Sequence, residues 1–231
     1  MSSTLTSKGD FECRLAYFGG AINSDTRDLG KEFQDLEVFF IQATMMMGYD
    51  VRVTQSFLNW LIRYGAVLCP SKIKKLMGKT DHDASILGVF ISYLKEYDSR
   101  PNRWRLLAPF AKKTHRILFP DLPVPKNTNP HFSKFGITAP MLLPNEAKYL
   151  LPKEAVLRNC PELRYRSMVM GTVSSDIHSL IEKKGTAMTP YEMAKITHHH
   201  KAQVYSMINT MNRLGSMVGS GVVEKSKIPK P

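Results

Sequence analysis

The stretch from Thr172 to Gly215 constrains the fold most, because two breaks divide it into three short helical segments. The first break falls at residues 184–187, where Gly185 provides the conformational freedom that a helix end needs. Residues 189–192 read TPYE, which gives an N-cap threonine, a proline at the first helical position and a glutamate at the third, so they form a capping box. A second break near residues 197–198 precedes a longer amphipathic segment. The pattern predicts a helix, a short helix, a tight turn and a longer helix.

The last of these helices, predicted from His199 to Leu214, separates apolar from polar residues. At about 100° per residue, one side collects the apolar side chains Val204, Met207, Ile208, Met211 and Leu214. The opposite side and its flank hold His199, Ala202, Gln203, Ser206, Asn209, Thr210 and Arg213. The helix contains no Asp or Glu, whereas ordinary solvent-facing helices carry Glu and Lys in i,i+4 pairs.

Such an outer face has the composition that DNA reading requires. Asn and Gln can bond adenine edges, Arg can bond guanine or phosphate, and small side chains let the backbone approach a groove. The sequence therefore predicts a helix-turn-helix whose last helix contacts DNA.

The residues beyond Gly215 extend this prediction. Gly219 and Gly221 frame a turn, and the basic segment from Val222 to Ile228 predicts a short strand. A helix-turn-helix followed by a glycine turn and a basic extended segment resembles the winged-helix superfamily. Over residues 172–228 only, the chain is similar to MarR-like and ArsR-like bacterial regulators. The similarity lies in three segments, IHSLIEKKG, MTPYEMAKIT and VYSMINTMNRLG. The resemblance implies a wing beside the reading helix, although this segment is short and lacks a clear second strand.

The charge of the chain favours a polyanionic partner. It carries 32 Lys and Arg against 20 Asp and Glu, a net charge of +12. The excess is densest in residues 158–231, and the alternative is a basic protein with solvated lysines. Candidate phosphate contacts, each of which could instead be a plain surface charge, are Arg164, Arg166, Lys201, Lys225 and Lys227.

The first half of the chain predicts an all-helical bundle over residues 1–118. Apolar spacing predicts helices over residues 29–47, 51–65, 70–77 and 84–97, and a further helix over residues 102–113 that is interrupted at Pro109. No segment alternates with period two for long enough to predict a sheet. The three lysines of helix 70–77 could form a second phosphate-contacting surface, but a solvated helix face is the preferred interpretation.

Residues 119–152 differ in composition, because they contain seven prolines and no sustained helical period. Their apolar residues argue against a disordered tether, so we expect an ordered connector. Residues 153–231, which begin with a further helical segment around Pro161, then form the predicted DNA-binding domain.

Nothing in the sequence predicts an enzyme, a cofactor or a metal site. Three consecutive histidines at residues 198–200 would point about 100° apart on a helix and could not all ligate one metal. Neither HExxH, Cys-x-x-Cys, a P-loop nor GxGxxG occurs. The acids at residues 81 and 83 precede a helix, where capping explains them. Three scattered cysteines (Cys13, Cys69, Cys160) and the absence of a signal or membrane-spanning stretch favour a cytoplasmic protein.

The sequence thus predicts a mainly α protein, with an N-terminal helical bundle and a C-terminal winged helix-turn-helix that carries a small β wing. The expected function is sequence-specific binding of double-stranded DNA in transcriptional regulation, plausibly of its own operon, as in antitoxins. The bundle would supply a homodimer interface or bind a protein partner. The alternative is a protein–protein interaction module that uses a winged helix without nucleic acid.

Overall fold

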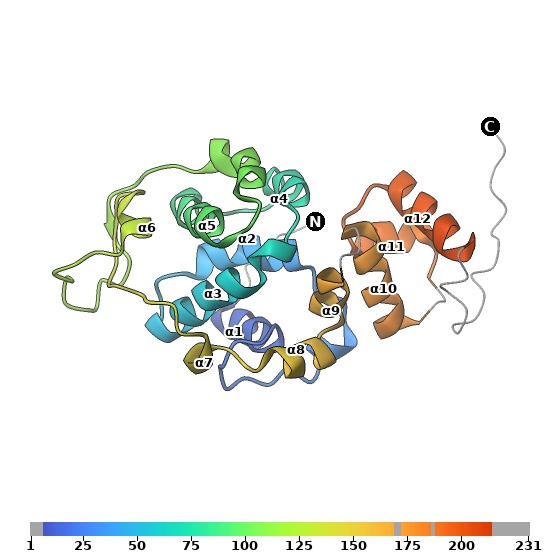
Figure 1. The fold of residues 1–231 in the computed structure, drawn as a ribbon, viewed down its shortest axis with the longest axis horizontal. Coiled ribbons are helices and arrows are strands. Elements are labelled where there is room, and N and C mark those ends of the chain that lie inside the picture. Colours follow the sequence, from blue (N-terminus) through green and yellow to red (C-terminus); the bar gives the residue numbers. More distant parts are fainter. Residues whose placement is uncertain (1–6, 169–171, 186–187, 214–231) are drawn as a thin grey trace.

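The computed structural model describes residues 7–168, 172–185 and 188–213, and these are mainly helical with one small sheet (Figure 1). The larger unit, called the bundle, contains in order α1 (Lys8–Tyr17), η1 (Leu29–Lys31), α2 (Leu36–Met46), α3 (Val51–Tyr64), η2 (Gly65–Val67), α4 (Pro70–Met77), α5 (Ala84–Tyr97), η3 (Pro101–Phe110), β1 (Arg116–Ile117), α6 (Pro130–Ser133), β2 (Ile137–Thr138), α7 (Glu146–Tyr149), α8 (Lys153–Asn159) and α9 (Pro161–Ser167). The C-terminal unit contains α10 (Thr172–Lys184), α11 (Pro190–Ile196) and α12 (Lys201–Arg213). None of the helices in the described ranges has the length and apolar character needed to cross a bilayer.

Aromatic side chains fill the core of the bundle. Phe39 meets Trp60 edge-on with ring centroids 5.1 Å apart, and Phe57 stacks on Trp60 at 5.5 Å. Phe57 also contacts Phe90 of α5 at 4.9 Å, so α2, α3 and α5 share one aromatic cluster. All four rings are buried, and large buried rings stabilise a core through their area and their geometry.

Several predicted helices are confirmed, together with the signals that start them. Asp50 caps α3 through the amides of Arg52 and Val53, and Pro70 occupies the first turn of α4. Asp83 caps α5, as expected from the acids that precede that helix.

The helix predicted over residues 29–47 is wrong in its first part. Its start forms only the short 3₁₀ helix η1, and α2 begins at Leu36 because the Asp35 carboxylate accepts hydrogen bonds from the amides of Glu37 and Val38. Phe33, which a continuous helix over residues 29–47 would include, lies in the extended segment before α2. Its side chain packs instead against the apolar core of the C-terminal unit.

Two further expectations about local structure are corrected. Residues 101–110 form the 3₁₀ helix η3, which accommodates Pro109. The prediction of no sheet is wrong, since β1 and β2 pair in parallel with Arg116 opposite Ile137. These strands have two residues each, too short to leave an alternating pattern. Gly136 precedes β2 with φ +75°, and an added Cβ would collide with the backbone carbonyl of Thr114.

The proline-rich segment 119–152 is ordered, as predicted, but it belongs to the bundle core. It contributes buried side chains to the same apolar cluster, namely Phe119, Phe132, Ile137, Ala139, Leu142 and Leu150. Helices α8 and α9, assigned from the sequence to the C-terminal domain, add Val156, Cys160 and Leu163 to that cluster. The apolar core of the bundle therefore extends to α9.

The three helices of the C-terminal unit enclose a second, smaller core, which is made by Ile177, Leu180, Met193, Ala194, Val204, Ile208 and Met211. Helix α10 packs along α9 and joins this unit to the bundle, and α11 and α12 lie on its other side (Figure 1). The predicted wing and its candidates Lys225 and Lys227 lie outside the described residues.

Candidate nucleic-acid interface

Helices α11 and α12, which the sequence predicted as the two helices of a helix-turn-helix, pack against each other. The predicted capping box at the start of α11 is confirmed, since the Thr189 side chain accepts from the Glu192 amide and the Glu192 carboxylate accepts from the Thr189 amide. The chain then turns at His198, whose φ of +57° lies in the left-handed region. The turn of residues 197–200 connects the end of α11 to the start of α12.

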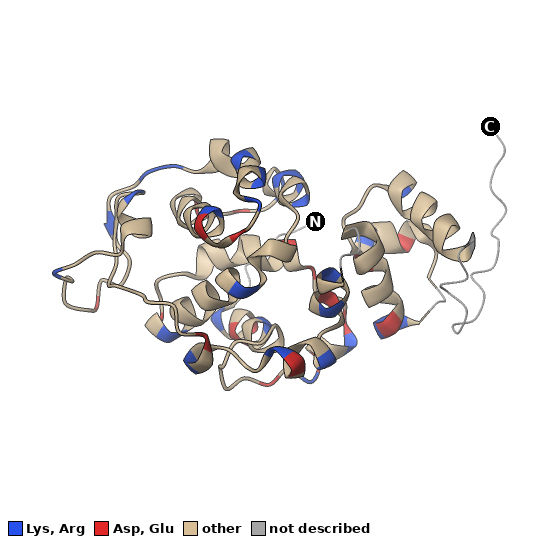
Figure 2. Cartoon of the chain, viewed as in Figure 1, with Lys and Arg blue, Asp and Glu red and all other residues tan. Residues whose placement is uncertain are grey.

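The outer face of α12 is exposed and lacks acidic residues. Six side chains predicted for DNA contact, Lys201, Ala202, Gln203, Ser206, Asn209 and Thr210, lie on its exposed surface. No Asp or Glu occurs in the helix (Figure 2). The same surface also exposes Tyr205 and Asn212, which were not predicted from the sequence. Arg213 is the last residue of α12, and its side chain lies outside the described part of the structure.

A cation–π contact fixes the position of Lys201 at the start of α12. Its Nζ lies 3.9 Å from the centroid of the Tyr191 ring on α11. Both residues are exposed, so the positive charge is held at the surface between the two helices. A phosphate could still reach this ammonium group from the solvent side.

The prediction that His199 lies on the outer face of the helix is wrong. Helix α12 begins at Lys201, so His199 belongs to the preceding turn and points inward. Its Nε2 lies 2.8 Å from Oδ2 of Asp176 on α10, and its side chain is only 7% exposed. His199 therefore connects the turn to the interior of the protein.

The two arginines of α9 also do not have the expected free surface positions. Arg166 is 2% exposed and pairs with Glu37 and Asp176, so it cannot reach a phosphate. Arg164 is partly exposed, but it pairs with Glu182 of α10 and lies over the Tyr165 ring. Both side chains serve contacts within the protein, because α9 is covered by α10.

Six charged or titratable side chains form one buried charge network between the bundle and the C-terminal unit: Asp35, Glu37, Lys72, Arg166, Asp176 and His199. They come from the start of α2, from α4, α9 and α10, and from the α11–α12 turn. Each side chain is at most 7% exposed. The network unites three carboxylates, two permanent cations and one histidine.

Arg166 and Lys72 hold the centre of the network. The Arg166 guanidinium donates to both oxygens of Glu37, at 2.9 and 3.0 Å, and to Oδ1 of Asp176 at 2.7 and 3.0 Å. Lys72 Nζ lies 2.8 Å from Oδ2 of Asp176, 2.8 Å from Oδ2 of Asp35 and 3.2 Å from Oε2 of Glu37. Such multiply bonded buried pairs are geometrically specific, and the loss of one member leaves the others unpaired.

The carboxylates of the network differ in their acidity. Burial dominates at Asp35 and raises its pKa to about 7, with the neighbouring Glu37 adding to the effect. Burial also acts on Glu37, but the positive charges of Arg166 and Lys72 outweigh it and lower the pKa to about 2. For Asp176 the same two cations outweigh burial, so its pKa is lowered as well. Asp35 is thus the weakest acid of the three.

A second buried anchor lies at the other end of α10. Lys183 is 3% exposed and donates to Oε1 of Glu162 at 2.6 Å and to the carbonyl oxygen of Glu32 at 2.6 Å. Its Nζ also lies 4.6 Å from the Tyr17 ring centroid. Helix α10 is therefore fixed to the bundle in its second turn, at Asp176, and in its last turn, at Lys183.

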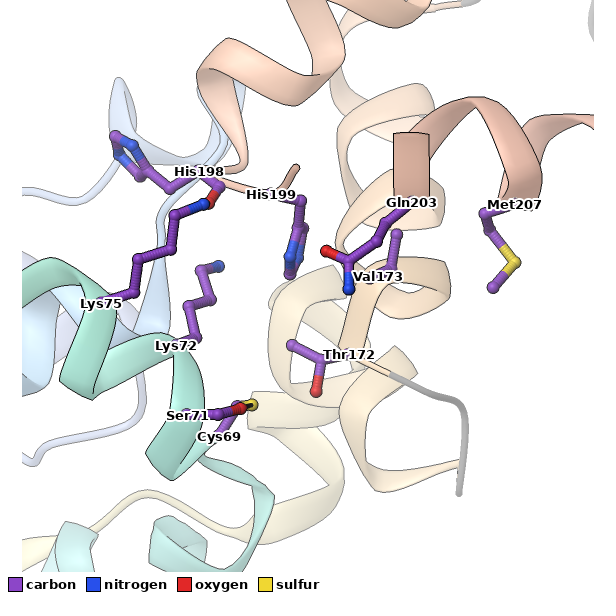
Figure 3. Close-up of a pocket in the computed structure, with 10 residues that line it drawn as sticks. All are labelled: Cys69, Ser71, Lys72, Lys75, Thr172, Val173, His198, His199, Gln203 and Met207. Atoms are coloured by element: carbon purple, nitrogen blue, oxygen red, sulfur yellow. Dashed lines mark hydrogen bonds between the residues drawn. The ribbon is translucent and has the colours of Figure 1, made fainter. Parts of the chain in front are cut away.

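A cavity of about 420 Å³ opens between α4 and the C-terminal unit (Figure 3). This space, called the α4–α12 cleft, is lined by Cys69, Ser71, Lys72, Lys75, Thr172, Val173, His198, His199, Gln203 and Met207. Gln203 comes from the exposed flank of α12, so the cleft adjoins the surface predicted to contact DNA. The described residues contain no group of three or more His, Cys, Asp or Glu side chains that could hold a metal ion.

Comparisons with models of protein families, with curated proteins and with solved structures find no match to this chain. Any functional assignment must therefore come from the residues and their geometry.

Proposed function

We propose that the protein binds double-stranded DNA through α12 and acts as a sequence-specific transcriptional regulator. The observation that carries the proposal is the exposed face of α12, which presents amides, hydroxyls and Lys201 and has no carboxylate. Side chains of these kinds bond base edges in the major groove, whereas carboxylates would be repelled by the phosphates. The net charge of +12 supports the same class of partner.

A single α12 reads only a few base pairs, so we propose that two copies act together on a two-fold site. Helix-turn-helix dimers contact half-sites about one turn of DNA apart, about 34–36 Å. The bundle is large enough to supply the dimer contact or a surface for a protein partner. Control of the protein's own operon, as in antitoxins, is one form that such regulation takes.

The test is DNA binding by a variant with two carboxylates on α12, Ser206→Glu with Asn209→Glu. Both side chains are exposed, so the fold should survive, while the added charges would face the phosphates. We expect affinity for a duplex pool to fall at least about 100-fold, or about 2.7 kcal/mol. The matched control is Ala155→Glu with Asn159→Glu, which adds the same charge at exposed positions of α8.

Fluorescence anisotropy at about 50 and about 200 mM salt measures both the affinity and its salt dependence. Circular dichroism establishes that both variants are folded. The proposal fails if the wild-type protein does not bind duplex DNA even at the lower salt. If the α12 variant binds as tightly as the control, α12 is not the reading helix.

The second candidate function is a protein-interaction module without nucleic acid. One observation favours it, which is the exposure of large side chains on α11 and α12, with Tyr191 51%, Ile196 38% and Tyr205 44% exposed. An interface formed by these groups would be mainly apolar, so its affinity should change little over the same range of salt. The steep salt dependence of phosphate binding separates the two functions.

A further inference from the structure

The α4–α12 cleft has lysines on one wall and histidines on the other. The bundle contributes Lys72 and Lys75 from α4, and the turn before α12 contributes His198 and His199 (Figure 3). No Asp or Glu belongs to the described residues that line the cleft. The uncharged polar groups on its walls, such as Ser71 and Gln203, can donate hydrogen bonds.

The basic side chains of the cleft differ in what they offer to a ligand. Lys72 and His199 are already paired with Asp176 behind the cleft wall. Lys75 is exposed and donates one hydrogen bond, from Nζ to the carbonyl oxygen of His198 at 3.0 Å. An ammonium group has three protons, so Lys75 is held at the cleft and can still donate to an anion.

The electrostatic surroundings of His198 are consistent with a cleft lined by basic side chains. Burial lowers the pKa of His198, and the positive charges of Lys72, Lys75, His199 and Lys79 lower it further. The mouth of the cleft is therefore a region of positive potential, where an anion is favoured.

The position of the cleft indicates which anion fits. It lies beside the first turn of α12, where the helix dipole adds partial positive charge. Gln203 belongs both to the cleft lining and to the exposed flank of α12. A DNA strand that follows a groove occupied by α12 would therefore pass the cleft with its phosphates. Helix α4 also exposes Lys74, which adjoins Lys75 in the chain.

We propose that the α4–α12 cleft seats a backbone phosphate of the DNA that α12 reads, with Lys75 of the bundle as its main cationic contact. This inference rests on the proposed function, and it makes the bundle part of the DNA interface. Lys75, one of the α4 lysines for which a solvated face was the preferred interpretation, becomes a phosphate contact, whereas Lys72 belongs to the buried charge network. The contact carries no sequence information, but it fixes how α12 is oriented on the duplex.

The test is Lys75→Gln, which removes the charge and keeps a long polar side chain. The control is Lys113→Gln, because Lys113 is an exposed lysine on the segment before β1, at the far end of the bundle (Figure 1). Loss of one phosphate contact should lower the slope of log K against log salt by about 0.9 and weaken binding equally for all sequences. The control should keep the wild-type slope.

Failure of this inference differs from failure of the proposed function. If Ser206→Glu with Asn209→Glu abolishes binding while Lys75→Gln keeps the wild-type affinity and slope, α12 reads DNA and the cleft proposal is overturned. If the wild-type protein binds no duplex, inorganic phosphate is titrated at constant ionic strength while the His198 ring is followed by NMR. A shift that Lys75→Gln removes would make a small phosphate compound the occupant and overturn the assignment to DNA. Without any shift, the cleft is no phosphate site.

Discussion

The two units of this protein are stabilised in different ways. The bundle has a large core with stacked aromatic rings, including Phe39, Phe57 and Trp60. The core of the C-terminal unit consists of aliphatic and methionine side chains and Ala194, and it has no aromatic residue among its buried members. A unit of about 40 residues usually cannot bury enough surface to be stable alone. We infer that α10–α12 depend on the bundle for their stability.

The contact between the units is mainly polar where it is most deeply buried. The buried charge network and the Lys183–Glu162 pair replace the apolar packing that would ordinarily hold two units together. Charges of this kind are costly to bury, and they stabilise a contact only when every partner is present. The orientation of α10 is therefore specified by geometry, and the network is sensitive to the loss of any one member.

The largest effect is expected from Arg166→Ala, which leaves Glu37 and Asp176 buried without their bidentate partner. We expect the free energy of unfolding to fall by about 3–5 kcal/mol. Both tryptophans, Trp60 and Trp104, are buried in the bundle, so their fluorescence reports on the bundle alone. In urea, far-UV circular dichroism should change before tryptophan fluorescence, because the C-terminal unit unfolds first.

The matched control is Arg164→Ala on the same helix. Its pair with Glu182 is partly exposed, with side chains 30% and 39% accessible, so its loss should cost less than about 1 kcal/mol. In Arg166→Ala, the circular dichroism and fluorescence transitions in urea could coincide, and the loss of unfolding free energy could be no larger than in Arg164→Ala. That result would mean that the network does not hold the units together.

Local signals in the sequence predicted much of the fold and of the α12 surface. The capping box at Thr189 and the period of α12 depend on residues within two helical turns, and both features are found. The start of α12 was placed two residues early, because nothing local marks the left-handed turn at His198. That error moved His199 from the interior to the surface.

The buried charge network could not be predicted, because its members are distant in sequence. Glu37 on α2 and Arg166 on α9 are 129 positions apart in the chain, so only the folded protein brings them together. The sequence did contain one signal, which is a charged residue on the apolar side of a helix. Asp176 lies between Val173 and Leu180 on the apolar side of α10, and Lys72 adjoins Ile73 on the apolar side of α4. A charge on an apolar face indicates a buried partner, but not which residue it is.

A smaller, pH-dependent effect distinguishes Asp35 within the network. Its folded pKa of about 7 exceeds its ordinary value of 3.8, so it stabilises the fold fully below 3.8 and this contribution is lost as the pH rises through 7. Asp35→Asn keeps the N-cap of α2 and removes the titration. The difference in unfolding free energy between the variant and the wild type should therefore shift in favour of the variant from pH 5 to pH 8, by at most about 1.4 kcal/mol per pH unit.

Urea titrations of both proteins at each pH give this difference directly. A difference that is flat from pH 5 to pH 8 would mean that Asp35 is ionised throughout and that Lys72 fully compensates its burial.

The smallest effect compares two similar capping boxes, one in each unit. Ser7 and Asp10 cap α1 of the bundle, and Thr189 and Glu192 cap α11. Thr189→Ala and Ser7→Ala should each cost about 1 kcal/mol locally. Because the C-terminal unit has little core of its own, Thr189→Ala should accelerate amide hydrogen exchange across α10–α12, whereas Ser7→Ala should affect only the first turn of α1. Exchange that is faster only near Thr189 would show that the C-terminal unit does not open as one cooperative unit.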